Sequence, residues 1–228
     1  LCNNTINALI QLDGGRLLVG TSRGACILDT SSEKFTRIRG CGDEHIRNFG
    51  MSGDSVWVCT ANGALLFKNP AAITSEQPRR FLTGRPVSCT RVIEGRRWFG
   101  SQNEIFYIDG RGEMHASGGD FQYHGHDNLV LDIVEDPWSE NSLLLGTEYG
   151  MLQYSLGDGK YNVLSRGTAV RSFLIDHRNR LWVGTDNGLT LSESAIRSAR
   201  YVHNQADTRS LPDNVVSLVM SDSRNNIW

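Results

Sequence analysis

The stretch Leu181-Trp182-Val183-Gly184-Thr185-Asp186-Asn187-Gly188 decides the fold, because its pattern recurs along the chain. Each copy has an aromatic residue or leucine, one apolar residue, Gly (Cys59 in the second copy), then Thr or Ser, and most copies have another Gly after two further residues. Consecutive copies are 39, 41, 46 and 38 residues apart, and the other four read Leu18-Val19-Gly20-Thr21, Trp57-Val58-Cys59-Thr60, Trp98-Phe99-Gly100-Ser101 and Leu144-Leu145-Gly146-Thr147. A sixth copy begins at Val215 and reaches its aromatic position at Trp228. Self-similarity at a period of about 40 residues indicates a repeat architecture.

Each repeat contains four apolar segments separated by turn residues. In the fifth copy the predicted strands are 170–175, 181–185, 189–192 and 201–203, joined by turns at 176–179 and 186–188. Gly and Asn recur in these turns because tight hairpins need residues that accept a positive φ. The first strands of the six copies are predicted at Ile6–Leu12, Ile46–Met51, Val87–Ile93, Val130–Glu135, Val170–Ile175 and Val215–Met220.

Four-stranded antiparallel units of this length are stable when stacked as the blades of a β-propeller. The sequence therefore predicts an all-β chain with five full blades and a partial sixth, as an incomplete part of a larger propeller. A β-sandwich is the alternative fold, but a sandwich has no reason to repeat one motif. The predicted blades are residues 1–39, 40–81, 82–118, 119–165, 166–205 and 206–228.

The motif positions have predicted structural roles. Trp57, Trp98, Trp182 and Trp228 share one position, where we expect a buried ring that packs between blades. Gly20, Gly100, Gly146 and Gly184 share another position, where a missing side chain allows close backbone approach.

Composition limits the partners of the chain. Lys and Arg (23) nearly balance Asp and Glu (25), so there is no basic surplus to neutralise a phosphate backbone, and we expect no nucleic-acid partner. No apolar run approaches the roughly 20 residues that span a bilayer. The five cysteines form no metal-binding motif, and we expect neither a metal nor a cofactor; a Cys2–Cys41 disulfide stays open as an alternative to free thiols.

Two segments resemble a known repeat. Residues 176–189 (DHRNRLWVGTDNGL) and 211–228 (LPDNVVSLVMSDSRNNIW) are similar to the two-component regulator propeller repeat. The resemblance covers nearly the whole chain, most closely in the fifth and sixth copies. It is looser in the second and third copies, and in the third Gln102-Asn103-Glu104 lacks the usual Gly.

This resemblance implies a function. It implies the periplasmic sensor domain of a Bacteroidetes hybrid two-component system sensor histidine kinase/response regulator, with the parent protein anchored in the inner membrane as a homodimer. The implied ligand is an oligosaccharide derived from a polysaccharide, and the implied output is transcription of polysaccharide-utilisation genes. The fragment itself is then not an enzyme. Two alternatives remain. One is a scaffold or dimerisation segment of the same receptor. The other is a propeller glycoside hydrolase, because Glu135-Asp136-Pro137-Trp138 resembles a segment found in propeller glycosidases.

Ligands of propellers usually meet the loops that enter the inner strands and the turns between second and third strands. These loops predict a binding face made of Arg23, His45, Asn62, Arg85, Gln102, His126, Asp127, Glu148, Tyr149, Asp186 and Asn214. The aromatic ring of Tyr149 could stack on a sugar, while the polar side chains could bind its hydroxyl groups.

Catalytic and metal-binding interpretations are weaker. Glycoside hydrolysis would need two paired carboxylates, and nothing in the spacing pairs the four candidates, Asp127, Asp132, Glu148 and Asp186. His124-Gly125-His126-Asp127 alternates as metal ligands on a strand would, but a solvated loop explains it better. We therefore expect a binding or scaffolding role.

Overall fold

The computed structural model describes residues 1–228 and contains five antiparallel four-stranded sheets. The only helical segment is one turn of 3-10 helix at Arg39–Cys41. No helix has the length and apolar content that a membrane span requires. The chain divides into two compact units, Leu1–Arg91 and Val92–Trp228, which are described separately below.

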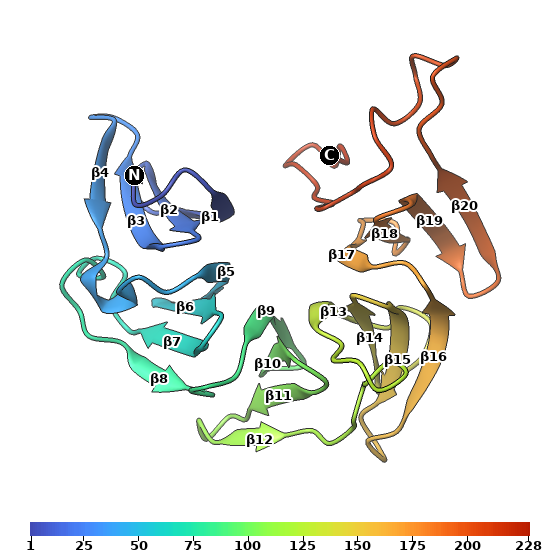
Figure 1. Ribbon diagram of the computed structural model, residues 1–228, viewed down its shortest axis with the longest axis horizontal. Helices are drawn as coiled ribbons and strands as arrows, with labels where there is room; N and C mark the ends of the chain where they lie inside the picture. Colours follow the sequence, from blue (N-terminus) through green and yellow to red (C-terminus); the bar gives the residue numbers. More distant parts are fainter. The chain divides into compact units, whose positions relative to one another are not determined.

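The first unit holds two complete sheets, in each of which neighbouring strands follow chain order (Figure 1). The strands of the first sheet are β1 (Ile6–Leu12), β2 (Arg16–Thr21), β3 (Gly24–Asp29) and β4 (Lys34–Arg37). Those of the second are β5 (Ile46–Ser52), β6 (Ser55–Thr60), β7 (Gly63–Phe67) and β8 (Arg79–Phe81). Their shared core includes Leu18, Ile38, Ile46, Val58 and Leu65, each almost fully buried.

The second unit holds two complete sheets and most of a third. The divided sheet has the order β12-β11-β10-β9, with β9 (Val87–Ile93) at the boundary between the units and β10 (Arg96–Ser101), β11 (Ile105–Ile108) and β12 (Met114–Ala116) beyond it. The next sheet has β13 (Val130–Glu135), β14 (Ser142–Thr147), β15 (Gly150–Ser155) and β16 (Tyr161–Arg166). The last has β17 (Val170–Ile175), β18 (Leu181–Thr185), β19 (Gly188–Ser194) and β20 (Arg197–Tyr201).

The predicted strands of the five full repeats are confirmed, with one shift: the fourth strand of the fifth repeat is Arg197–Tyr201, where 201–203 was predicted. In the partial sixth repeat the predicted strand Val215–Met220 is wrong, because no continuous ladder forms there. The amide of Val216 donates to the carbonyl of Thr185, and Met220 exchanges backbone hydrogen bonds with Trp228 beside the isolated bridge between Ser221 and Ile227.

The Thr of the motif closes the turn between the second and third strands in four copies, at Thr21, Thr60, Thr147 and Thr185. The hydroxyl of Thr147 donates to the carbonyl of Gly150 at 2.9 Å, and the hydroxyl of Thr185 donates to that of Gly188 at 2.8 Å. Gly150 has a φ of 148°, and an added Cβ there would lie 2.1 Å from the Ser165 carbonyl oxygen. Glycine is therefore required at this turn by both conformation and space.

Gly146 and Gly184 allow close backbone approach by the following segment, as predicted, and Gly20 lies against the side chains of Ile46 and Phe49. A Cβ added at Gly146 would lie 2.8 Å from the carbonyl oxygen of Val170 on β17. At Gly184 it would lie 2.9 Å from the carbonyl oxygen of Val216. These approaches bring β17 against β14 and the segment around Val216 against β18.

The shared Trp position is only partly as predicted. Trp57 and Trp98 are buried, whereas Trp182 is partly exposed and Trp228 is 72% exposed, so the expectation of a buried ring is wrong for Trp228. The ring centroids of Trp57 and Phe81 are 5.1 Å apart, and those of Trp98 and Tyr107 are 4.9 Å apart. Each of these ring contacts lies within one sheet.

All five cysteines are free thiols, so the Cys2–Cys41 disulfide is not formed. The thiol of Cys2 donates to the carbonyl oxygen of Ala25 at 3.3 Å. Burial raises the pKa of the Cys41 thiol to about 12.

Candidate functional site

Backbone hydrogen bonds join the two kinds of loop that the sequence analysis combined. The amide of Gly24 donates to the carbonyl of Glu44 at 2.7 Å in the first unit. In the second unit the backbone amide of Glu148 donates to the carbonyl of Leu129 at 3.2 Å, and the backbone amide of Gly188 donates to the carbonyl of Asn214 at 2.6 Å. Each turn between second and third strands therefore lies beside a segment that enters an inner strand. We call this the loop end of each unit.

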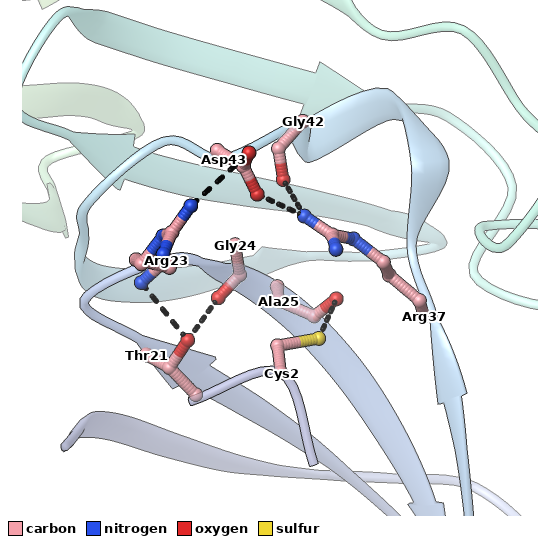
Figure 2. A network of polar contacts seen from close by, with 8 residues as sticks. All are labelled: Cys2, Thr21, Arg23, Gly24, Ala25, Arg37, Gly42 and Asp43. Atoms are coloured by element: carbon pink, nitrogen blue, oxygen red, sulfur yellow. Dashed lines mark hydrogen bonds and ion pairs between the residues drawn. The ribbon is translucent and has the colours of Figure 1, made fainter. Parts of the chain in front are cut away.

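At the loop end of the first unit, two arginines surround one carboxylate. Figure 2 shows Arg23 and Arg37 reaching Asp43 from opposite sides. Arg37 forms a short hydrogen bond with Asp43 and also donates to the carbonyl of Gly42 at 2.9 Å, whereas Arg23 Nη2 is 3.8 Å from Asp43 Oδ2. The hydrogen bond from Arg37 lowers the pKa of Asp43. Because all three side chains are well exposed, this network adds little stability.

The other predicted residues of this unit, His45, Asn62 and Arg85, contact neighbouring loops. The ring nitrogen Nε2 of His45 is 3.2 Å from Asn7 Nδ2, and Asn62 Oδ1 accepts the amide of Gly84 at 2.9 Å. The Arg85 backbone amide donates to the carbonyl of Leu82. Asn62 thus fixes the loop that leads toward β9.

At the loop end of the second unit, Asp127 is held by two amide side chains. Its carboxylate accepts Asn103 Nδ2 at 2.8 Å and a side-chain hydrogen bond from Gln102, and these bonds lower its pKa. His126 pairs through its backbone with Tyr123, which closes a hairpin over His124 and Gly125, both of which have a positive φ.

A second charged group joins the inner strand β17 to the turn between β18 and β19. Arg171 forms a bidentate pair with Asp186, with one short bond and one of 2.8 Å between Nη2 and Oδ2. The hydrogen bond with Asp186 raises the pKa of Arg171, and Glu148 adds to the effect through its charge. Glu148 also accepts the amide of Leu129 at 3.4 Å. Sequence reasoning included Asp186 in the binding face but missed Arg171.

Tyr149 stacks on a protein ring. The rings of Tyr149 and Tyr123 are nearly parallel, with an interplanar angle of 9° and centroids 4.9 Å apart. One face of Tyr149 is therefore covered, so only its other face could meet a ligand.

Asn214, the last residue of the predicted binding face, holds a neighbouring backbone group: its Oδ1 accepts the amide of His203 at 2.7 Å.

The candidate catalytic carboxylates have structural partners. Asp132 is buried, and its Oδ2 accepts the amide of Phe173 on the next sheet at 2.8 Å. Asp136 Oδ1 accepts the amide of Trp138 at 2.9 Å and its Oδ2 accepts Gln153 Nε2 at 2.7 Å. Asp136 and Trp138 line an open groove of about 430 Å³ at the β13–β14 turn, away from the loop end.

One cluster has the composition of a metal site. Ligand atoms of Asp109, Glu113 and His115 lie within 4.8 Å of one another at the β11–β12 hairpin. Asp109 Oδ1 accepts the amides of Arg111 and Glu113, and its Oδ2 is 3.0 Å from His115 Nε2. Asp109 therefore organises the hairpin.

Five four-stranded sheets in chain order, each repeating one motif, define the chain as a β-propeller protein. Residues 165–187 match the family model described as the two component regulator propeller. A search of curated proteins gave no match.

Solved structures share the fold at low identity. The extracellular domain of the candidate hybrid two component system BT4673 from B. thetaiotaomicron is 19% identical with a TM-score of 0.82, over 98% of this chain and 31% of that chain. The extracellular domain of the candidate hybrid two component system BT3049 from the same organism is 17% identical with a TM-score of 0.76, over 100% and 32%. Virginiamycin B lyase from Staphylococcus aureus is 12% identical with a TM-score of 0.68, over 98% and 76%. The chain thus spans about a third of the two bacteroidal structures.

Proposed function

We propose that the chain is part of the extracytoplasmic ligand-sensing domain of a hybrid two-component system sensor histidine kinase/response regulator. The match of residues 165–187 to the two component regulator propeller carries this proposal. The fold shared with two extracellular domains of B. thetaiotaomicron supports it. In the proposed receptor the chain lies in the periplasm, the parent protein is anchored in the inner membrane, and two copies form a homodimer.

The proposed ligand is an oligosaccharide derived from a polysaccharide, and the proposed output is transcription of polysaccharide-utilisation genes. The loop ends carry amide, carboxylate and guanidinium groups, which are suited to hydrogen bonding with sugar hydroxyl groups. Signalling requires only that the ligand bind one receptor state more tightly than the other.

A glycoside hydrolase is disfavoured by the carboxylates. Such an enzyme needs two of them about 5 to 10 Å apart across a cleft, one with a raised pKa. Here the pKa of Asp127 is lowered, Asp132 holds a backbone amide, and Asp186 is paired with Arg171.

A scaffold or dimerisation role is the second candidate. The pairing of Arg23 with Asp43 and of Arg171 with Asp186 favours it, because these groups already satisfy one another. A ligand would have to compete with those contacts.

Sugar-induced transcription by the full receptor separates the two candidates. Replacing Tyr149 or Arg23 by Ala should weaken the response if the loop ends sense the ligand. Arg178→Ala and Trp138→Ala are controls. Trp138 lies in the turn between β13 and β14 and Arg178 in the turn between β17 and β18, at the opposite end of each sheet from the loop end. A wild-type response from both loop-end variants would contradict sensing by this face and favour the scaffold.

A further inference from the structure

The first strands of four sheets carry a β-bulge at their second residue. The bulge lies beside the residue that follows the Thr of the motif, because the amide of that residue donates to the backbone carbonyl just before the first strand. The backbone is therefore arranged in the same way at all four bulges. The bulge residues are Asn7, Arg47, Leu131 and Arg171, and the residues after the motif Thr are Ser22, Ala61, Glu148 and Asp186, in the same order.

In two of these sheets the bulge side chain contacts the side chain after the motif Thr. Asn7 Nδ2 lies 3.4 Å from Ser22 Oγ, and Arg171 forms its bidentate pair with Asp186. The shared backbone thus directs a bulge side chain toward this position. In β17 the result is an arginine that holds a carboxylate.

The second sheet has the arginine without the carboxylate. Ala61 stands where the fifth repeat has Asp186, and it is exposed. The partly buried side chain of Arg47 forms no hydrogen bond or ion pair within the protein. Nε is the only nitrogen of Arg47 that is buried without a partner, so Nη1 and Nη2 are open to solvent. A partly desolvated guanidinium without an acceptor is costly, and an oxyanion at the two open nitrogens would offset that cost.

The charge of this loop end also favours an anion. Arg23 and Arg37 share the single carboxylate of Asp43, so these three side chains carry a net positive charge. The carboxylate of Glu44 has an arginine partner of its own. Residues 1–91 contain more Lys and Arg than Asp and Glu, although the formal net charge of the chain is -2. An anionic group is therefore attracted to the first unit.

We propose that Nη1 and Nη2 of Arg47 form a subsite for an oxyanion, the carboxylate or sulfate group of an acidic saccharide, at the loop end of the first unit. A planar guanidinium can bind such a group through two parallel hydrogen bonds. Beside it, Ala61 offers only a methyl group where the fifth repeat has the carboxylate of Asp186. The saccharide rests on the sensing function proposed above and narrows its ligand to an acidic oligosaccharide. The oxyanion subsite itself can be tested without the receptor.

Glucuronate is the probe, because it joins a carboxylate to a sugar ring; glucose is its neutral counterpart, and sulfate is tested separately. The Nε–H signal of Arg47 is followed by NMR in the labelled 228-residue chain at constant ionic strength. Ala61→Asp should place a carboxylate beside Arg47, as Asp186 lies beside Arg171. Ala71→Asp is the matched control, because Ala71 is also exposed but lies between β7 and β8, at the opposite end of the second sheet from the loop end.

We expect a saturable shift of the Arg47 signal with glucuronate in the native chain and in Ala71→Asp. Binding should be weakened at least about tenfold in Ala61→Asp, because the new carboxylate competes for the guanidinium and repels the probe. Glucose should give no saturable shift over the same range of concentration.

The absence of a saturable shift with both glucuronate and sulfate would overturn the subsite, and so would equal weakening in the two Asp variants or equal binding of glucose. Saturation by sulfate alone would support the subsite and assign it to a sulfate group. If glucuronate binds as expected but a full receptor carrying Ala61→Asp responds to its inducing sugar like wild type, the oxyanion subsite stands and sensing through it fails.

Discussion

The indole nitrogen of Trp182 donates a hydrogen bond of 2.9 Å to Oδ2 of Asp176, six residues earlier in the chain. The same carboxylate accepts the backbone amides of Arg178 and Arg180 and the side chain of Arg180. Asp222 repeats the arrangement with the indole of Trp228 at 3.1 Å. In these two copies the Trp is therefore tied to the turn that precedes it by an Asp six residues earlier.

Asp176→Asn should lower the free energy of unfolding by about 2 to 3 kcal/mol, the range for hydrogen bonds to a charged group. The variant keeps the size of the side chain but loses the charge and one acceptor. Urea unfolding followed by tryptophan fluorescence measures the change. Asp158→Asn is the control, because Asp158 is exposed in the β15–β16 turn. Equal losses in the two variants would contradict a special role for Asp176.

Acid should destabilise the chain through the same carboxylates. Desolvation by burial would raise the pKa of Asp176, but hydrogen bonds from Trp182 and Arg180 outweigh it and the pKa is lowered, while that of Asp222 falls to about 2. A carboxylate with a lowered pKa in the folded state stabilises the fold above its unfolded pKa of about 3.9 and loses that effect as pH falls through the folded value. Stability should therefore drop from about pH 4 toward pH 2. The drop should be shallower in Asp176→Asn; an unchanged pH profile in that variant would contradict the assignment.

The tryptophans of the repeat should differ in their contribution to stability. Trp98→Ala should cost about 3 to 5 kcal/mol, as for other large buried aromatic rings, because Trp98 is 2% exposed. Trp182→Ala should cost less, since its ring is partly exposed. Chemical unfolding of both variants gives the comparison, and a larger loss at Trp182 would show that the exposed ring carries more packing than its burial suggests.

Gly184→Ala should weaken the contact between β18 and residues 216–219. The added Cβ would lie 2.9 Å from both the carbonyl oxygen and Cγ1 of Val216, and overpacking of this kind costs about 1 to 3 kcal/mol. Gly110→Ala is the control, because an added Cβ there meets nothing within 4 Å. Hydrogen exchange of residues 216–219 should accelerate in the first variant alone. Unchanged exchange would contradict the close-approach role of the glycine.

The fold could be predicted because its signals are local and repeated. Gly188 and Asn187 mark a turn in the sequence itself, and the spacing of apolar residues locates the strands. The inner strand Val170–Ile175 was predicted to the residue. The last segment failed because a strand also depends on its ladder partner, which no local pattern reports.

The candidate site was only partly predictable. Arg171 could not be found, because a bulge between Val170 and Ser172 shifts the register and changes which side chains share a face. Asn128, next to Asp127, gave no signal either, since the bonds of its backbone amide to Asn103 Oδ1 and of its side-chain Nδ2 to the carbonyl of Phe121 are contacts that no sequence pattern reports. The polar residues of turns can be identified from sequence, but the side chains and backbone groups with which they form hydrogen bonds and ion pairs cannot.

Isothermal titration of the 228-residue chain with a panel of polysaccharide-derived oligosaccharides tests the sensing function most directly. The account predicts that at least one oligosaccharide binds, with a dissociation constant on the order of 1 μM, equivalent to about −8 kcal/mol. Tyr149→Ala should weaken that binding, and Trp138→Ala should leave it unchanged. Absence of binding across the panel by a folded chain would contradict the account and assign this segment to the scaffold of its receptor.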